Sequence, residues 1–220
     1  MVNVLFSLVS TNIERRTKEC LITHVFSFII LHSMFNIPGA ATPQPNPLIK
    51  GVSMLIYSGI KINVRKDEII LDNGRKAVRE VIEHPGSSAI IPFISEDEII
   101  LIQQYRHAVK ETIYEIPAGT LDKGETFAAC AARELEEETG YRAGKLAPLT
   151  IIYPSPGILS ETMHLFKATN LTKTKTNHQD DESIKGIMQI KLQEAFEMVR
   201  KGVIKDAKTV CSILLCMTNS

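Results

Sequence analysis

Residues 119–141, GTLDKGETFAACAARELEEETGY, join a glycine-containing loop to a segment of alanines and glutamates. Alanine and glutamate favour the α-helix and a following glycine stops it, so a helix is predicted over residues 126–139, ending before Gly140. Ala128, Ala132 and Leu135 would form its apolar face. The acidic residues crowd the second half of this helix, where like charges repel one another.

The spacing of three glutamates indicates what offsets this repulsion. Glu134, Glu137 and Glu138 stand at positions i, i+3 and i+4, which share one face of a helix. A hard divalent cation that prefers oxygen ligands would stabilise them together, and Mg²⁺ is the usual one. The alternative is a solvated acidic surface in which Arg133 is an ordinary ion-pair partner.

Length and composition narrow the class of protein. The chain has 220 residues, 44% of them hydrophobic, with 25 basic and 25 acidic residues. This length suits one domain with an extra segment, and a net charge of zero does not favour nucleic acid as a partner. The four cysteines form no CxxC pair and no zinc spacing with histidine, so we interpret them as reduced thiols of a cytoplasmic protein.

The first part of the chain differs from the rest. Residues 1–53 are expected to form a disordered or partly apolar extension with a proline-rich linker. Its apolar stretch at residues 21–35 is interrupted by His24 and His32 and is too short for a comfortable membrane span. A signal or anchor segment is the alternative for this stretch. The folded domain is expected to cover residues 54–220, with no membrane contact of its own.

The folded part combines strands with a few helices. Alternating or continuously apolar runs indicate strands within residues 56–84, 88–94, 97–107, 112–119, 146–153 and 161–169. Residues 191–202 and 206–217 have the pattern of helices, the first closed by Gly202. Strands on both sides of one helix, followed by further helices, predict a mixed α/β or α+β sandwich.

The segment that contains the acidic helix resembles the signature of the Nudix hydrolases over its whole length. The matching positions are Gly119, Glu125, Arg133, Glu134, Leu135, Glu137, Glu138 and Gly140. The next position is usually aliphatic, and here it is Tyr141. The resemblance implies a Nudix-type α/β/α sandwich with a mixed sheet, and hydrolysis of a nucleoside diphosphate linked to another moiety.

The resemblance also implies a metal centre. Glu134, Glu137 and Glu138 would be both catalytic and metal-binding, with the Ala118 carbonyl as a further ligand of Mg²⁺ or, alternatively, Mn²⁺. Divalent ions of this kind bridge pyrophosphate oxygens, neutralise them and activate water.

Three further residues of the signature would support the centre. Arg133 would orient a carboxylate through a bidentate pair. Glu125 would lie near the N-terminus of the helix, where negative charge is favoured. Gly119, together with Gly124 of the same loop, would let the loop turn tightly and bring the backbone close to a ligand or metal.

The flanking segments resemble the ADP-ribose pyrophosphatase branch of the family. Pro156, in the SPG sequence, stands sixteen residues after Gly140, and QQYRH and REVIEHPGSS also match this branch. By resemblance, Arg106 and Arg79 would bind the substrate together with Pro156, and Glu115 would touch substrate across a dimer. The alternatives are surface arginines, a water-facing carboxylate and an ordinary proline turn.

A polar segment at residues 178–186 would complete the catalytic residues. In the resemblance, Glu182 falls on the glutamate that positions or deprotonates the attacking water, and Asp180 on a supporting carboxylate that is more often glutamate. The alternative is a solvated loop. The branch also implies that residues 54–84 form an antiparallel sheet used in dimerisation, and that residues 85–220 form the catalytic core of a homodimer.

The expected function is Mg²⁺-dependent hydrolysis of ADP-ribose or a related ADP-sugar into AMP and a sugar phosphate such as ribose 5-phosphate. One alternative is a pyrophosphatase for another nucleotide sugar, NADH or a dinucleoside polyphosphate. A second is a Nudix module that senses a nucleotide without turnover, although the presence of all three glutamates favours an enzyme.

Overall fold

A computed structural model describes residues 51–174 and 184–218 of the chain. The expectations for the extension at residues 1–50, which includes the stretch 21–35, lie outside the described residues. The same holds for Asp180 and Glu182.

The core is built around β4 (Ser87–Pro92), which has no exposed residue. β4 lies inside a four-stranded sheet of order β7-β4-β9-β8, formed with β7 (Ala118–Thr120), β9 (Met163–Lys173) and β8 (Tyr141–Ile152). β4 and β9 are parallel, whereas the other pairs are antiparallel. The predicted mixed sheet is therefore confirmed.

A second sheet has three strands in the order β10-β5-β6. Its members are β5 (Glu98–Arg106), β6 (Glu111–Glu115) and β10 (Ile184–Lys191), all antiparallel. Residues 99–102 of β5 are buried without interruption, as expected for a strand covered on both faces.

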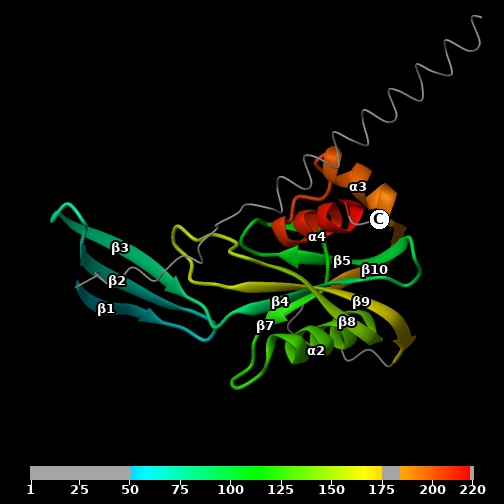
Figure 1. Ribbon diagram of the computed structural model, residues 1–220, viewed down its shortest axis with the longest axis horizontal. Coiled ribbons are helices and arrows are strands. Elements are labelled where there is room, and N and C mark those ends of the chain that lie inside the picture. Colours follow the sequence, from blue (N-terminus) through cyan, green and yellow to red (C-terminus); the bar gives the residue numbers. More distant parts are fainter. Residues whose placement is uncertain (1–50, 175–183, 219–220) are drawn as a thin grey trace, which may run out of the picture. The chain divides into compact units, whose positions relative to one another are not determined.

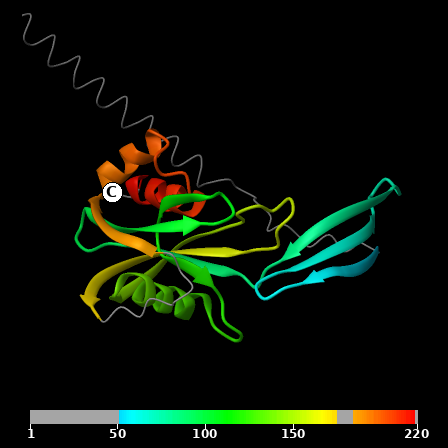
Figure 2. The same ribbon diagram turned by 180° about the vertical axis from the view of Figure 1, so that it is seen from behind.

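Helices cover the strands from two sides, as Figures 1 and 2 show. α2 (Phe127–Thr139) lies on one side, and α3 (Leu192–Arg200) and α4 (Ala207–Thr218) lie on the other. Successive residues of β4 point to opposite faces, so Ile90 packs in the cluster under α2 and Ile91 in the cluster under α3 and α4. This alternation confirms the predicted three-layer α/β/α sandwich.

Local signals set the ends of α2 where they were predicted. Thr126 caps the helix by accepting a hydrogen bond from Ala129 N at 3.2 Å, and Gly140 ends it with φ 72°. The apolar face predicted from Ala128, Ala132 and Leu135 is wrong for its two alanines, which are exposed.

The face of α2 that lies on the core carries acid as well as apolar side chains. It contains Ala131 and Leu135 together with Glu134 and Glu138, which are only 7% and 2% exposed. Two carboxylates thus occupy positions that a periodicity based on apolar residues cannot predict.

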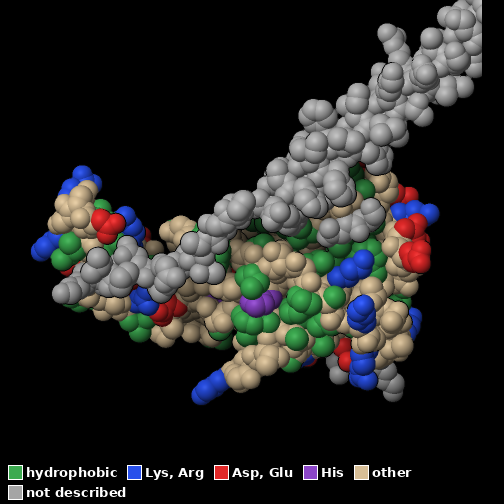
Figure 3. Space-filling view, in the orientation of Figure 1, with side chains coloured by type: hydrophobic (Ala, Val, Ile, Leu, Met, Phe, Trp, Pro, Cys, Tyr) green, Lys and Arg blue, Asp and Glu red, His purple; other side chains and the backbone are tan. Residues whose placement is uncertain are grey.

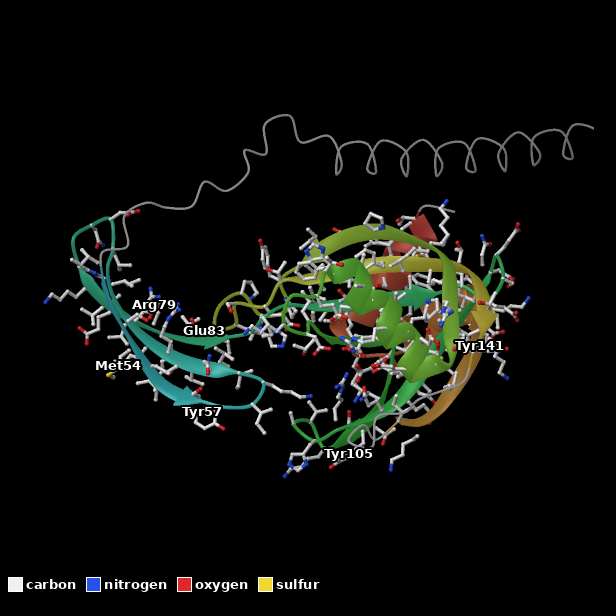
Figure 4. The ribbon with its side chains drawn as sticks, turned by 90° about the horizontal axis from the view of Figure 1, so that it is seen from below. Met54, Tyr57, Arg79, Glu83, Tyr105 and Tyr141 are labelled. Carbon is white, nitrogen blue, oxygen red and sulfur yellow. The ribbon has the colours of Figure 1, made fainter. Side chains whose placement is uncertain are left out.

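The N-terminal sheet is antiparallel, as predicted, and begins at Gly51 rather than at the expected 54–56. Its strands are β1 (Gly51–Ser58), β2 (Asn63–Ile70) and β3 (Lys76–Glu83). Figure 4 labels Met54, Tyr57 and Arg79 on this sheet. Every residue of β1 is exposed, and five of its large hydrophobic side chains are more than half exposed: Val52, Met54, Leu55, Ile56 and Tyr57.

Two observations concern spanning helices and the charge on one face of the described residues. In the part of the chain that the structure describes, no helix is both long and apolar enough to cross a membrane. On the face shown in Figure 3, the described basic and acidic side chains form separate small groups rather than one continuous basic patch.

Candidate active site

The site forms where α2 packs against β7 at Gly119. A Cβ atom added to Gly119 would lie 1.7 Å from Glu134 Oε1, and 2.0 Å from its carboxyl carbon. Only glycine therefore lets the Glu134 carboxylate lie against this strand. Of the two glycines expected to turn the loop, Gly124 has a positive φ, +84°.

Arg133 donates hydrogen bonds to three of the acidic residues. Its Nε and Nη2 donate to the two Glu125 oxygens, each at 2.9 Å. Its Nη1 donates to Glu134 Oε1 at 2.6 Å and to Glu137 Oε2 at 3.1 Å, and Nη2 also donates to Thr120 O at 3.2 Å. A guanidinium has five N–H donors, so these five contacts use its full capacity.

The charges around Arg133 shift one another's protonation. The hydrogen bonds from Arg133 lower the pKa of Glu125 to about 2, against the opposing effect of burial. The hydrogen bond to Glu125 and the charge of Glu134 raise the pKa of Arg133. Both groups are therefore ionised throughout the neutral range, and Glu125 holds the arginine that contacts Glu134 and Glu137.

Glu138 is anchored separately. Its Oε2 accepts a hydrogen bond from Ala118 N at 3.0 Å, which ties the last turn of α2 to the start of β7. Ala118 thus contacts a glutamate through its N–H, and it is the residue whose carbonyl is expected to bind metal. The face of α2 and this strand lie side by side, as a shared metal centre would require.

The donor set suits a hard divalent cation, although the ligands are not pre-assembled. Among residues 51–174 and 184–218, no three His, Cys, Asp or Glu side chains are arranged as a ready metal site. The guanidinium of Arg133 contacts both Glu134 and Glu137. The residues present still fit a cation, because Glu134 and Glu138 are carboxylates on one helix face and both line an open cavity.

A cavity of about 370 Å³ opens over this face. Its volume lies in the range of small-molecule sites. The residues that line it include Lys61, Arg106, Ala118, Gly119, Asp122, Arg133, Glu134, Glu137 and Glu138. The cavity thus brings Arg106 together with the predicted metal ligands, although these residues are up to thirty-two positions apart in the sequence.

Arg106 and Glu115 form a bidentate pair at the cavity. Arg106 Nε and Nη2 donate to the two oxygens of Glu115, each at 2.7 Å, and the arginine side chain is 41% exposed. Glu115 is fully buried. In this arrangement Glu115 reaches a substrate only through Arg106, so the direct contact across a dimer stays a prediction.

Two predicted substrate residues lie away from the cavity lining. Arg79 is exposed on β3, where its Nη1 donates to Val78 O at 2.9 Å. Pro156 is exposed in the segment between β8 and β9. This segment is attached to β3, because Ile82 N donates to Ile158 O at 2.7 Å.

Sequence reasoning missed Lys208 and Asp206 at the start of α4. Lys208 is buried and donates to Glu115, and also to Asp206 Oδ1 at 2.9 Å. The signal that could have found it is a lysine in the first turn of an otherwise apolar helix. Such a lysine requires a buried acidic partner.

Comparison with known proteins agrees with this geometry. The NUDIX domain family matches residues 84–212. The chain is 39% identical over 159 residues to the ADP-ribose pyrophosphatase of Bacillus subtilis strain 168, which covers 72% of this chain and 86% of the relative. It is 35% identical over 142 residues to the GDP-mannose pyrophosphatase of Cronobacter sakazakii, covering 60% of this chain and 73% of the relative.

A solved structure shares the fold. The crystal structure of an ADP compounds hydrolase superposes with a TM-score of 0.65 and 22% identity, covering 79% of this chain and 95% of the other. With the family match over more than half of the chain, these findings show that the chain belongs to the NUDIX family. It is a Nudix hydrolase that is similar in sequence to an ADP-ribose pyrophosphatase.

The approach of Glu134 to Gly119 can be tested by adding one methyl group. Gly119→Ala should weaken Mn²⁺ binding by about 10- to 100-fold, the usual effect of disturbing a ligand's support, because the new Cβ displaces the Glu134 carboxylate. Gly186→Ala is the control, since its Cβ would meet no atom within 4 Å. Mn²⁺ titration followed by electron paramagnetic resonance measures both affinities, and equal affinities in the two variants would contradict the assignment.

Proposed function

We propose that the chain hydrolyses the pyrophosphate bond of ADP-ribose or a related ADP-sugar in a Mg²⁺-dependent reaction, giving AMP and a sugar phosphate such as ribose 5-phosphate. The observation that carries this proposal is the single cavity that combines the acidic face of α2 with Arg106. The similarity to an ADP-ribose pyrophosphatase over 86% of that relative supports the substrate class.

Glu134, Glu137, Glu138 and the Ala118 carbonyl would hold the cation, for which Mn²⁺ is the alternative. When bound, such an ion neutralises pyrophosphate oxygens and lowers the pKa of a water molecule. Arg133 keeps Glu134 and Glu137 oriented toward the cavity while Glu125 anchors the arginine.

Arg106 would bind a phosphate of the substrate. Its side chain lines the cavity, and a guanidinium matches phosphate geometry. Glu115 already occupies its Nε and Nη2, so Nη1 is the group left to face a ligand. Arg79 and Pro156 are proposed as further substrate contacts, and Glu115 as a residue that touches substrate across a dimer.

A homodimer is part of this proposal. The five exposed hydrophobic side chains of β1 offer an apolar surface that a second copy of the chain would cover. A cytoplasmic location is proposed from the free thiols Cys130, Cys211 and Cys216, and fractionation of full-length protein tests it.

Other nucleoside diphosphate compounds are the second candidate. The similarity to a GDP-mannose pyrophosphatase favours a nucleotide sugar with another base or sugar. A sensor without turnover would be compatible with the same cavity, but it does not require the three glutamates.

Turnover of a substrate panel tests the proposed reaction. ADP-ribose, ADP-glucose, GDP-mannose, NADH and diadenosine polyphosphates are incubated with Mg²⁺, and products are identified by chromatography. AMP and ribose 5-phosphate should form fastest from ADP-ribose.

Glu138→Gln should lower turnover by at least ~10²-fold, because a lost metal ligand removes stabilisation of several kcal/mol. Full activity of Glu138→Gln would contradict the assignment of the metal site. In the substrate panel, faster turnover of another compound would assign that compound as the substrate.

The role proposed for Glu182 has a separate kinetic test. If Glu182 positions or deprotonates the attacking water, Glu182→Gln should lower kcat by ~10²–10⁴-fold, the usual range for lost general-base assistance. KM for ADP-ribose should change little, because the cation and Arg106 still hold the pyrophosphate. A larger loss in Asp180→Asn would reverse the two roles. Normal rates in both variants would leave Glu137 as the candidate base.

The dimer is tested by placing a charge on β1. Leu55→Asp should weaken dimerisation at least ~10-fold, since an exposed apolar side chain that the second copy would cover becomes a carboxylate. Ile151→Asp on β8 is the matched control, because both side chains are slightly more than half exposed. Sedimentation equilibrium measures both dissociation constants. A monomeric wild type, or equal behaviour of the two variants, would show that this sheet is not the interface.

A further inference from the structure

A chain of buried polar contacts links the cavity to the start of α4. Glu115 accepts two hydrogen bonds from Arg106 and one from the Lys208 ammonium. Lys208 donates in turn to Asp206 Oδ1 at 2.9 Å. The Lys208 ammonium is thus shared between two carboxylates, and the interior holds two cations and two anions in alternation.

The same contacts reach the backbone in front of the acidic helix. Asp206 Oδ2 accepts hydrogen bonds from the N–H and the hydroxyl of Thr209, at 3.0 Å and 2.5 Å. The Thr209 oxygen accepts from Ile116 N at 2.9 Å. Ile116 directly follows β6 and lies two residues before Ala118. The start of α4 therefore holds the Glu115 side chain through Lys208 and the Ile116 backbone through Thr209.

A carboxylate as deeply buried as Glu115 needs more than one cation nearby. Burial raises its pKa, but the hydrogen bonds from Arg106 and the charge of Lys208 outweigh this effect, so that the pKa lies below its usual value. An ionised Glu115 is what keeps the bidentate contact to Arg106 in place.

Lys208 also affects the charge that Arg106 presents to the cavity. A single arginine paired with a single carboxylate would form a neutral unit with little attraction for phosphate. With Lys208 on the other side of Glu115, the three groups together carry one positive charge. Asp206 balances this charge at the far end of the network. Within this network, the positive charge nearest the cavity is therefore that of Arg106.

We propose that Lys208 is a positioning residue that acts through Glu115 to orient Arg106 and to keep its charge available to a substrate phosphate. The phosphate ligand rests on the proposed function, whereas the orientation of Arg106 does not. The competing role for Lys208 is structural alone, limited to attaching α4 to the core.

Substitution of two neighbouring lysines separates these roles. Lys208→Met removes the buried ammonium, and Lys205→Met removes an exposed one that pairs with Glu111 at 2.8 Å. Lys208→Met should raise KM for ADP-ribose ~10-fold with kcat within ~3-fold, because binding of the ground state and of the transition state weakens equally. Lys205→Met should leave both constants unchanged. Equal KM values in the two variants would overturn the proposal.

The Glu115→Gln background shows whether Lys208 acts through Glu115. If it does, adding Lys208→Met to Glu115→Gln should cause no further rise in KM, because the mediating carboxylate is already lost. A full additional ~10-fold rise in the double variant would mean that Lys208 acts by another route, which also overturns the proposal.

One measurement does not depend on turnover. The Nε–H of Arg106, assigned from the Arg106→Lys spectrum, should give a slowly exchanging ¹⁵N resonance in wild type and in Lys205→Met. It should be lost or exchange-broadened in Lys208→Met. A resonance that persists in Lys208→Met refutes the orienting role. If the resonance is lost in Lys208→Met and the wild type hydrolyses none of the nucleotide compounds, the result supports the orienting role and refutes the proposed function.

A second variant covers the case in which Lys208→Met does not fold. Asp206→Asn keeps an oxygen for Thr209 N and removes the charge that holds Lys208. It should change KM and the Arg106 resonance in the same direction, by a smaller factor. Wild-type values for both quantities in folded Asp206→Asn would overturn the proposal.

Discussion

The acidic helix depends on one arginine. Two unit charges 4 Å apart interact by about 4 kcal/mol at an effective dielectric constant of about 20, so neighbouring carboxylates on one helix face are costly without a cation. Arg133 places its five donors on Glu125, Glu134, Glu137 and Thr120 O. A lysine has the same charge but lacks the planar fork that reaches these oxygens together. Arg133 therefore allows the helix to fold with its carboxylates directed at one cavity.

Folding and chemistry impose opposite demands on this helix. Packing α2 against β7 and β4 requires a buried face, while the site requires acid on the same face. The sequence satisfies both demands with small residues. Ala131 of α2 packs in the core beside the acidic positions, and Gly119 of β7 leaves space for Glu134. Glu138 is stabilised in the interior by the Ala118 N–H. The carboxylates are consequently part of the packing, and their positions follow the backbone of β7.

Much of the fold could be predicted because its signals are local. Thr126 and Gly140 set the ends of α2, and Gly202, with φ 70°, follows the end of α3. The buried face of α2 was mispredicted because hydrophobic periodicity does not count buried glutamates. The start of β1 was placed too late because that strand is exposed and has no core pattern. The network of Glu115 and Lys208 could not be predicted, since it joins residues ninety-three positions apart through tertiary contacts alone.

The attachment of Ile116 to Thr209 also has a consequence for synthesis of the protein. The ribosome must add about a hundred residues after Arg106 before Lys208 and Thr209 exist, which takes on the order of ten seconds. During that interval Glu115 has no partner on α4, and the nascent strand end cannot be held by the Thr209 hydroxyl. The contact between Glu115 and Lys208 therefore forms only once α4 has docked, so the pair of Arg106 and Glu115 in an unfinished chain on the ribosome lacks this support.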